Sequence, residues 1–219
     1  MMSPKELKSH LEVTPKEHKD ATYIDRVPEK LSSSQVQDKK KFGQKELHQI
    51  VKVEAMQSKS ADEIEEIWKQ YHQNKDGLYA VLPKVTYEKL YTRSQKYPTF
   101  LFPLPRAQGY EFIMLQFLQH SCYFTSLINY QAFQENAPVC LTINYFTEFQ
   151  NDKGIVLMKG EYDDKVLKVH EAQCLANQLQ LYYGGTDEKK ERLLWNFNEQ
   201  PETFRHMDLI SNFEYNLGK

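Results

Sequence analysis

Residues 139–161 read VCLTINYFTEFQNDKGIVLMKGE, and this stretch decides the fold class. Its first part, 139–149, alternates with a period of two between a mainly apolar row and a more polar one, which is typical of a β-strand. The turn formers at 150–154 follow, and an apolar run returns from 155 to 161. Two strand patterns on either side of a turn cluster predict an antiparallel hairpin.

Other segments add further strands. Residues 110–119 have the composition of a strand, whereas 123–130 fits either a strand or a helix. A last strand is expected at 193–197. The character of the chain becomes β from Thr99. Residues 102–106 contain two prolines, and because proline has no amide hydrogen, we expect 102–106 at a sheet edge or a strand end.

Helices are predicted before and after these strands in the sequence. Ser60 and Glu63 form a capping-box pattern. An apolar stripe at helical spacing follows it: Ile64, Ile67, Trp68 and Tyr71. A second helix is expected to begin after Pro83 and to end by Tyr97. The strongest helical pattern covers 168–183, with a left-handed stop expected at Gly184 and Gly185. Helices around a mainly antiparallel sheet indicate an α+β fold.

The N-terminal quarter of the chain differs from the rest. Residues 1–60 contain only Tyr23 and Phe42 as aromatic residues, although the chain has 14 Tyr and 12 Phe. So little apolar surface cannot offset the chain entropy lost on folding. We therefore expect residues 1–59 to be mobile or partly helical, with 43–58 able to form a helix, and residues 60–219 to form one α+β domain.

Composition excludes several classes of function. A net charge of -2 gives no electrostatic reason to expect a nucleic-acid partner. No apolar run approaches the roughly 18 residues that a membrane helix needs, so no membrane insertion is expected. Cys122, Cys140 and Cys174 are far apart, which argues against a disulfide framework and a zinc site. They are typical of a reducing compartment, such as cytosol, nucleus or mitochondrial matrix.

Catalysis has little support from motifs. The chain has no glycine-rich phosphate loop, GxSxG nucleophile or HExxH metal motif, and we expect no cofactor. His170 and Cys174 are four residues apart on a predicted helix, which leaves open a small cysteine-dependent enzyme. The other reading is a structural thiol, since free cysteine is among the most buried residue types.

Four blocks of sequence occur together in one order. They are KYP at 96–98 leading into FPLPR at 102–106, FTSLINYQ at 124–131, KGIVLM at 153–158 and EAQCLANQLQ at 171–180. In this order they resemble the mitochondrial F(1)-ATPase assembly factor family, the chaperones of the ATP synthase β subunit. The resemblance covers about residues 60–215. It implies a non-enzymatic chaperone that binds free β subunit and prevents its aggregation until the α subunit replaces it.

The resemblance also implies a location in the mitochondrial matrix, and we expect a monomer. At the N-terminus, acidic residues such as Glu6 and Glu12 alternate with lysines, unlike a mitochondrial targeting segment. We therefore expect the targeting segment to be absent from this sequence.

Six residues are candidates for contact with the β subunit: Phe102, Leu104, Arg106, Phe146, Tyr182 and Tyr183. Aromatic and arginine side chains are enriched at protein interfaces. Residues 102–106 allow two interpretations. The segment is either a rigid turn whose apolar side chains fill the core, or a preformed contact surface whose Arg106 pairs with a carboxylate of the client.

Overall fold

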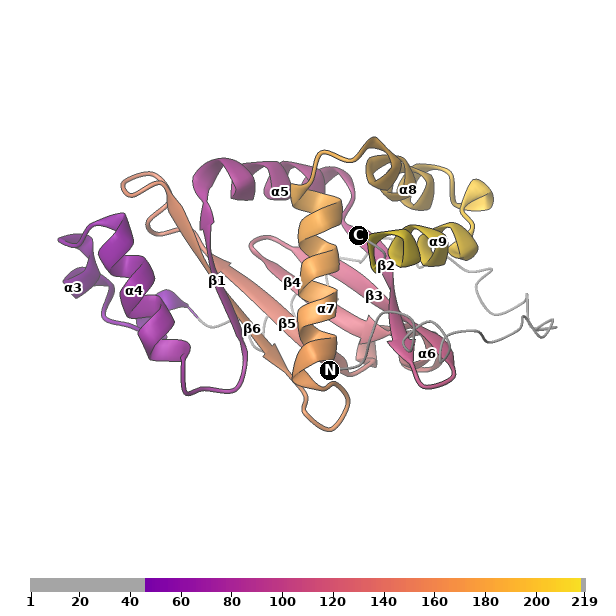
Figure 1. Ribbon diagram of the computed structural model, residues 1–219, viewed down its shortest axis with the longest axis horizontal. Helices are drawn as coiled ribbons and strands as arrows, with labels where there is room; N and C mark the ends of the chain where they lie inside the picture. Colours follow the sequence, from indigo (N-terminus) through magenta and orange to yellow (C-terminus); the bar gives the residue numbers. More distant parts are fainter. Residues whose placement is uncertain (1–45, 218–219) are drawn as a thin grey trace, which may run out of the picture.

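A six-stranded antiparallel sheet forms the centre of the protein, in a computed structural model that describes residues 46–217 (Figure 1). Its strands are β1 (Leu78–Pro83), β2 (Thr99–Arg106), β3 (Gly109–Leu118), β4 (Ser121–Ser126), β5 (Val139–Phe146) and β6 (Ile155–Tyr162). They lie in the order β1-β6-β5-β4-β3-β2. The sheet with its surrounding helices confirms the predicted α+β fold.

The hairpin at 139–161 is confirmed as β5 and β6. Phe146 lies opposite Leu157, and the ladder runs to the pair of Leu141 and Tyr162. In the turn, the Lys153 amide donates to the Phe149 carbonyl at 2.9 Å. Gly154 has a φ of 71°, a left-handed conformation that favours glycine, so the turn needs this residue.

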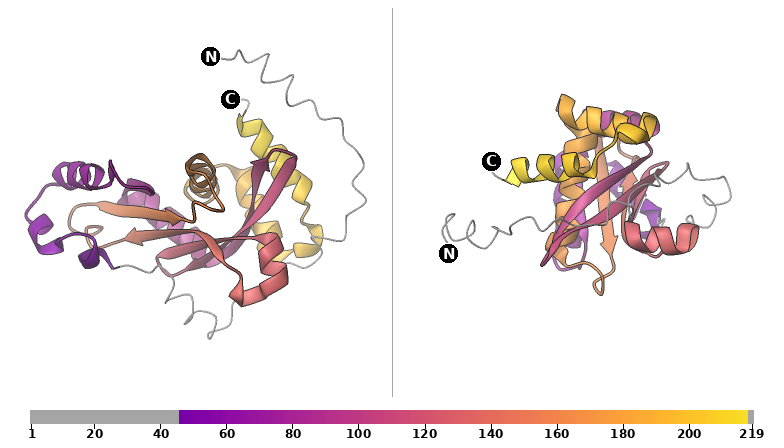
Figure 2. Two further views of the ribbon diagram at one scale, coloured as in Figure 1. Left: turned by 90° about the horizontal axis from the view of Figure 1, so that it is seen from below. Right: turned by 90° about the vertical axis from the view of Figure 1, so that its right-hand side faces the viewer.

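Helices cover both faces of the sheet. They are η1 (Leu47–Gln49), α3 (Val53–Gln57), α4 (Ala61–His72), α5 (Lys84–Lys96), α6 (Leu127–Phe133), η2 (Gln134–Asn136), α7 (Val169–Leu179), the π-helix η3 (Gln180–Gly184), α8 (Glu188–Glu199), η4 (Pro201–Thr203) and α9 (His206–Leu217). Figure 1 shows α7 crossing in front of the strands, with α5 and α8 beside its upper end. Figure 2 shows α6 on the opposite side of the sheet.

The main core lies between the sheet and the helices in front of it. Aromatic rings carry much of the packing. The ring centroids of Tyr182 in η3 and Phe100 in β2 are 5.0 Å apart, and those of Tyr183 and Phe117 in β3 are 4.8 Å apart. The Phe197 ring of α8 packs against Phe100, with the ring centroids 5.5 Å apart. Helix α8 and the π-helix therefore close the core over the β2–β3 side of the sheet.

A second cluster packs α4 against the far end of the hairpin. The capping box is confirmed, because the Glu63 amide donates to Ser60 Oγ at 3.2 Å and the Ser60 amide donates to Glu63 Oε2 at 2.9 Å. Trp68 is fully buried and its ring lies 6.0 Å from Phe146. Of the predicted stripe, Ile64 and Trp68 are buried, whereas Ile67 is exposed.

The chain before Ser60 contributes to this second cluster. Leu47 is 0% exposed and Met56 is 4% exposed, and both pack with Trp68. Within the described residues, the stretch expected to be partly helical contains two short helices, η1 and α3, instead of one continuous helix over 43–58. Packed structure therefore extends upstream of the capping box. The expectation of mobility for residues 1–45 lies outside the described residues.

The strand expected at 193–197 is wrong, because this segment belongs to helix α8. The Asp187 side chain caps the helix by accepting from the Lys189 amide at 2.9 Å. The buried residues of α8 recur at helical spacing: Lys190, Leu193, Leu194 and Phe197. A short apolar run does not by itself distinguish a strand from one face of a helix.

Three other segments differ in detail from the expectations. Strand β1 was not anticipated, and residues 123–130 contain both the end of β4 and the start of α6. The helix over 168–183 is confirmed as α7, but it ends in the π-helix η3. The left-handed stop is wrong, since Gly185 has a φ of -73°. Glycine is needed there because a Cβ would collide with the Leu181 carbonyl oxygen.

Candidate partner-binding site

Five of the six predicted contact residues lie in the interior. Exposed fractions are 0% for Phe102 and Tyr183, 1% for Leu104, 3% for Tyr182 and 5% for Phe146. The first four belong to the main core, whereas Phe146 packs in the α4 cluster, so the six residues do not form one surface. For Phe102 and Leu104, the interpretation as core-filling residues holds.

Arg106 is the partly exposed member of the set, but its guanidinium already has two carboxylate partners. Its Nε donates to Glu111 Oε2 at 2.8 Å, and its Nη1 donates to Glu171 Oε1. Burial alone would raise the pKa of Glu171, but the Lys168 amide and the Arg106 guanidinium together lower it. A carboxylate of a client would have to displace these partners, and contact by Arg106 stays a prediction.

The segment 99–106 forms an edge strand, as its prolines predict. The Phe117 amide donates to the Pro98 carbonyl at 2.8 Å, which sets the alternation of the ladder. The amides and carbonyls of the even-numbered residues of β2 therefore point toward β3, and those of the odd-numbered residues point outward. Pro103 and Pro105 therefore lie at outward positions, where an amide hydrogen would have no partner in the sheet.

Side-chain amides complete the covering of this edge. Gln178 Nε2 donates to the Pro103 carbonyl at 3.0 Å, and Asn198 Nδ2 donates to the Thr99 carbonyl at 2.9 Å. Thr99 and Leu101 are 7% and 2% exposed. The outward side of β2 is thus covered by α7 and α8 from Thr99 to Pro103.

The structure does not pair Cys174 with His170, as a cysteine-dependent enzyme would require. Cys174 Sγ accepts a hydrogen bond from Gln178 Nε2 at 3.6 Å, and burial raises the pKa of the thiol. His170 is exposed, and within residues 46–217 no hydrogen bond joins it to Cys174. A catalytic cysteine needs a lowered pKa, so this arrangement favours a structural thiol.

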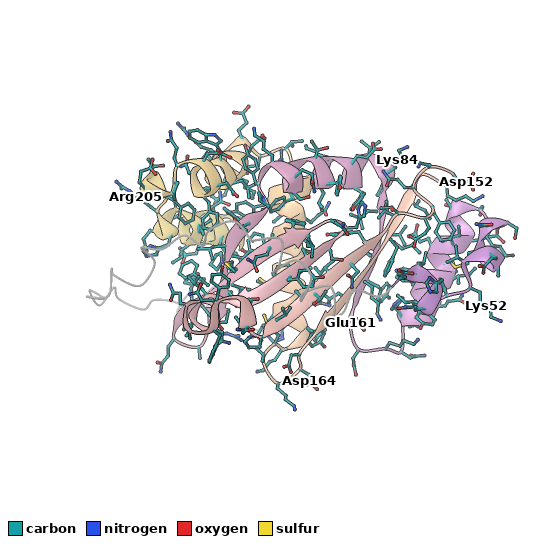
Figure 3. The ribbon with its side chains drawn as sticks, turned by 180° about the vertical axis from the view of Figure 1, so that it is seen from behind. Lys52, Lys84, Asp152, Glu161, Asp164 and Arg205 are labelled. Atoms are coloured by element: carbon teal, nitrogen blue, oxygen red, sulfur yellow. The ribbon has the colours of Figure 1, made fainter. Side chains whose placement is uncertain are left out.

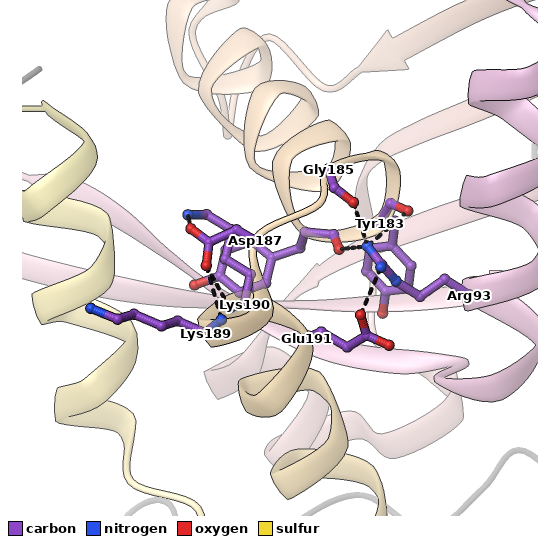
Figure 4. Close-up of polar contacts among 8 residues, drawn as sticks. Arg93, Tyr183, Gly185, Asp187, Lys189, Lys190 and Glu191 are labelled. Atoms are coloured by element: carbon purple, nitrogen blue, oxygen red, sulfur yellow. Dashed lines mark hydrogen bonds and ion pairs between the residues drawn. The ribbon is translucent and has the colours of Figure 1, made fainter.

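Arg93 links α5 to the end of the π-helix, as Figure 4 shows. Its Nη1 donates to the carbonyls of Tyr182, Tyr183 and Gly185 at 2.8, 3.3 and 3.0 Å, and Nη2 pairs with Glu191 at 2.9 Å. A cation is favourable at the C-terminal carbonyls of a helix. Sequence reasoning missed this residue, because nothing local links Arg93 to partners about 90 residues away.

Exposed apolar side chains are distributed over several elements. The most exposed are Val85 on α5, Ile128 and Phe133 on α6, and Met207 and Tyr215 on α9. Single exposed apolar residues are normal on soluble proteins and do not by themselves mark an interface. In the range 46–217, no three histidine, cysteine or acidic residues gather where they could hold a metal ion. No helix in that range combines the length and apolar character needed to cross a membrane.

Comparisons with known proteins identify relatives. The ATP11 protein family matches residues 2–210. ATP synthase mitochondrial F1 complex assembly factor 1 of Danio rerio is 46% identical over 78% of this chain and 56% of its own length. The Homo sapiens protein of the same name is 41% identical over 78% of this chain and 52% of its own length. Protein atp11, mitochondrial, of Schizosaccharomyces pombe is 31% identical over 72% of this chain and 58% of its own length.

This chain spans about half the length of the curated relatives that it matches. The family match nevertheless covers almost all of the chain. The four sequence blocks that suggested the resemblance also fall within the matched residues. The chain therefore belongs to the ATP11 protein family.

Proposed function

We propose that this protein is a chaperone for assembly of the catalytic sector of mitochondrial ATP synthase. It binds the unassembled β subunit, keeps that subunit from aggregating and releases it when the α subunit takes its place. The observation that carries the proposal is the family match over residues 2–210, together with relatives named as F1 complex assembly factors.

The physical need for such a protein is clear. A subunit built for a permanent interface exposes a large apolar surface while it is unpaired, and this surface promotes aggregation. A chaperone must cover the surface reversibly, so its own contact should be smaller than the final interface. Catalytic chemistry is not required, which agrees with a Cys174 thiol that has a raised pKa.

The proposed compartment is the mitochondrial matrix, and the proposed state of the free protein is a monomer. Cys122 and Cys140 are buried free thiols, and burial raises the pKa of each. Such thiols are compatible with a reducing compartment.

Refolding of the β subunit tests the proposal. Purified β subunit is diluted from denaturant, and light scattering is followed with and without an equimolar amount of this protein. We expect the scattering to be suppressed, and subsequent addition of α subunit to move β from the chaperone complex into an α–β complex on a sizing column. Unchanged scattering, together with no co-elution of the two proteins, would contradict the proposal.

A further inference from the structure

Strand β1 forms the second edge of the sheet, and its register shows which backbone groups point outward. The Lys84 amide donates to the Gly154 carbonyl at 2.8 Å, one step beyond the pair of Pro83 and Ile155. Because the pattern alternates in an antiparallel ladder, Leu78, Ala80 and Leu82 direct their backbone groups toward β6. Tyr79 and Val81 direct theirs away from the sheet.

The outward amides and carbonyls of Tyr79 and Val81 have no partner strand in the described part of the chain. β1 is the last strand of the sheet, and across the described range 46–217 no backbone hydrogen bond reaches Tyr79 or Val81 from the outer side. Tyr79 is 38% exposed and Val81 is partly exposed. Unpaired backbone groups on an edge strand are a template for a further strand. Unlike β2, β1 has a single proline, Pro83, at its end.

The surroundings hold this edge in place. The His72 ring of α4 stacks on the Tyr79 ring at 5.3 Å, and His72 Nδ1 donates to the Trp68 carbonyl at 2.9 Å. Figure 3 shows Lys84, the first residue of α5, at the same end of the molecule as Asp152 of the β5–β6 turn. Lys84 Nζ donates to Asn151 Oδ1 at 3.1 Å. The strand is therefore fixed at both ends before any partner arrives, which lowers the entropy lost on binding.

We propose that the outer edge of β1 binds an extended segment of the client by strand addition. Backbone amides and carbonyls at Tyr79 and Val81 would pair with the backbone of that segment, a mode that requires an extended chain and little specific sequence. The client is taken from the proposed function and is the unassembled β subunit. The open edge itself does not depend on that identity.

The size of the edge favours a client segment over a second copy of this chain. At about 3.3 Å a residue, six residues present an edge of about 20 Å, and a width of about 10 Å gives roughly 200 Å². A stable protein–protein interface buries roughly 800 Å² on each partner. Two outward residues thus support a contact that is weak and reversible, as release to the α subunit requires.

Hydrogen exchange of the full chain tests the pairing directly. Exchange of the Tyr79 and Val81 amides is measured by NMR or by mass spectrometry with fine fragmentation, without and with refolding β subunit. We expect both amides to exchange at least about tenfold more slowly in the complex, whereas the inward amides of Ala80 and Leu82 are protected in both states. Binding of β subunit without any slowing at Tyr79 and Val81 would overturn the inference.

A matched pair of variants separates the backbone from the side chain. Val81→Pro and Val81→Ala both remove the branched valine side chain, but only proline removes the outward amide hydrogen, and neither removes a hydrogen bond to β6. We expect Val81→Pro to weaken capture of β subunit about tenfold relative to Val81→Ala, at a similar melting temperature. Equal capture by the two folded variants would overturn the inference.

Two further outcomes keep the inference distinct from the proposed function. If the wild-type protein fails to capture β subunit at all, the proposed function fails, and so does the client named here. If the wild-type protein is a dimer by ultracentrifugation and Val81→Pro is a monomer, the occupant of the edge is a second copy of this chain. That result would also overturn the inference.

Discussion

The two edges of the sheet are treated in opposite ways. At β2, prolines lie at outward positions, and the amides of Gln178 and Asn198 bond to the outward carbonyls. At β1, the outward groups of Tyr79 and Val81 have no such cover in the described part of the chain. Edge strands promote unwanted pairing, and proteins usually block them. The contrast between the two opposite edges of one sheet is the reason for the proposal that the open edge binds a partner.

The largest expected effect concerns the support of the open edge. Trp68→Ala should lower the free energy of unfolding by about 3–5 kcal/mol, the range for truncation of a buried large aromatic residue. Trp68 is 0% exposed, and its Nε1 donates to the Met158 carbonyl at 3.3 Å. Urea unfolding measures the change. Trp195→Ala is the control, because Trp195 is 37% exposed and should cost less than about 1 kcal/mol.

The closed edge can be opened by removing its cover. Gln178→Ala leaves the Pro103 carbonyl without its side-chain donor and should destabilise the protein by about 1–3 kcal/mol. Gln173→Ala, an exposed change on the same helix, should stay within about 0.5 kcal/mol. A Gln178→Ala protein as stable as the Gln173→Ala control in urea unfolding would show that the amide does not seal the edge.

A smaller effect is expected at the end of the closed strand. Arg106 is partly exposed and holds two carboxylates, so Arg106→Ala should cost roughly 1 kcal/mol or less. Melting temperature and capture of β subunit are measured on the same preparation. If stability is nearly unchanged and capture is weakened, the predicted contact by Arg106 is supported. Unchanged capture, or capture lost only together with the fold, removes Arg106 from the site.

The smallest expected effect is a pH dependence to which His72, beside the open edge, contributes. Burial lowers the pKa of His72 and also that of His120, so both imidazoles resist protonation in the folded state. The unfolded chain takes up protons as the pH falls through about 6.5, and this uptake favours unfolding. Stability should therefore be fully present above about pH 7 and should fall toward pH 5, as the unfolded chain becomes protonated.

Melting temperatures across this range measure the slope for the wild-type protein and for His72→Gln. The variant should lose less stability over this range, because one of the two imidazoles with a lowered pKa is gone. Identical slopes for the two proteins would contradict the assignment to His72.

Local patterns in the sequence predicted the elements whose conformation depends on near neighbours. The hairpin at 139–161 follows from alternation and a glycine turn, and the start of α4 follows from two side chains three residues apart. The edge position of β2 follows from its prolines, since a missing amide hydrogen excludes any central strand. Membership of the ATP11 protein family also follows from sequence alone, because several blocks recur in one order.

Tertiary structure decided which residues are buried and which groups are left without partners. Phe102 and Tyr183 suit an interface by composition, but the face of the sheet and the π-helix place both in the core. The 193–197 run became a helix because its apolar face meets Phe100 across the core. The open edge at Tyr79 and Val81 arises because the order of the strands leaves β1 outermost, and that order depends on pairing between segments about 80 residues apart.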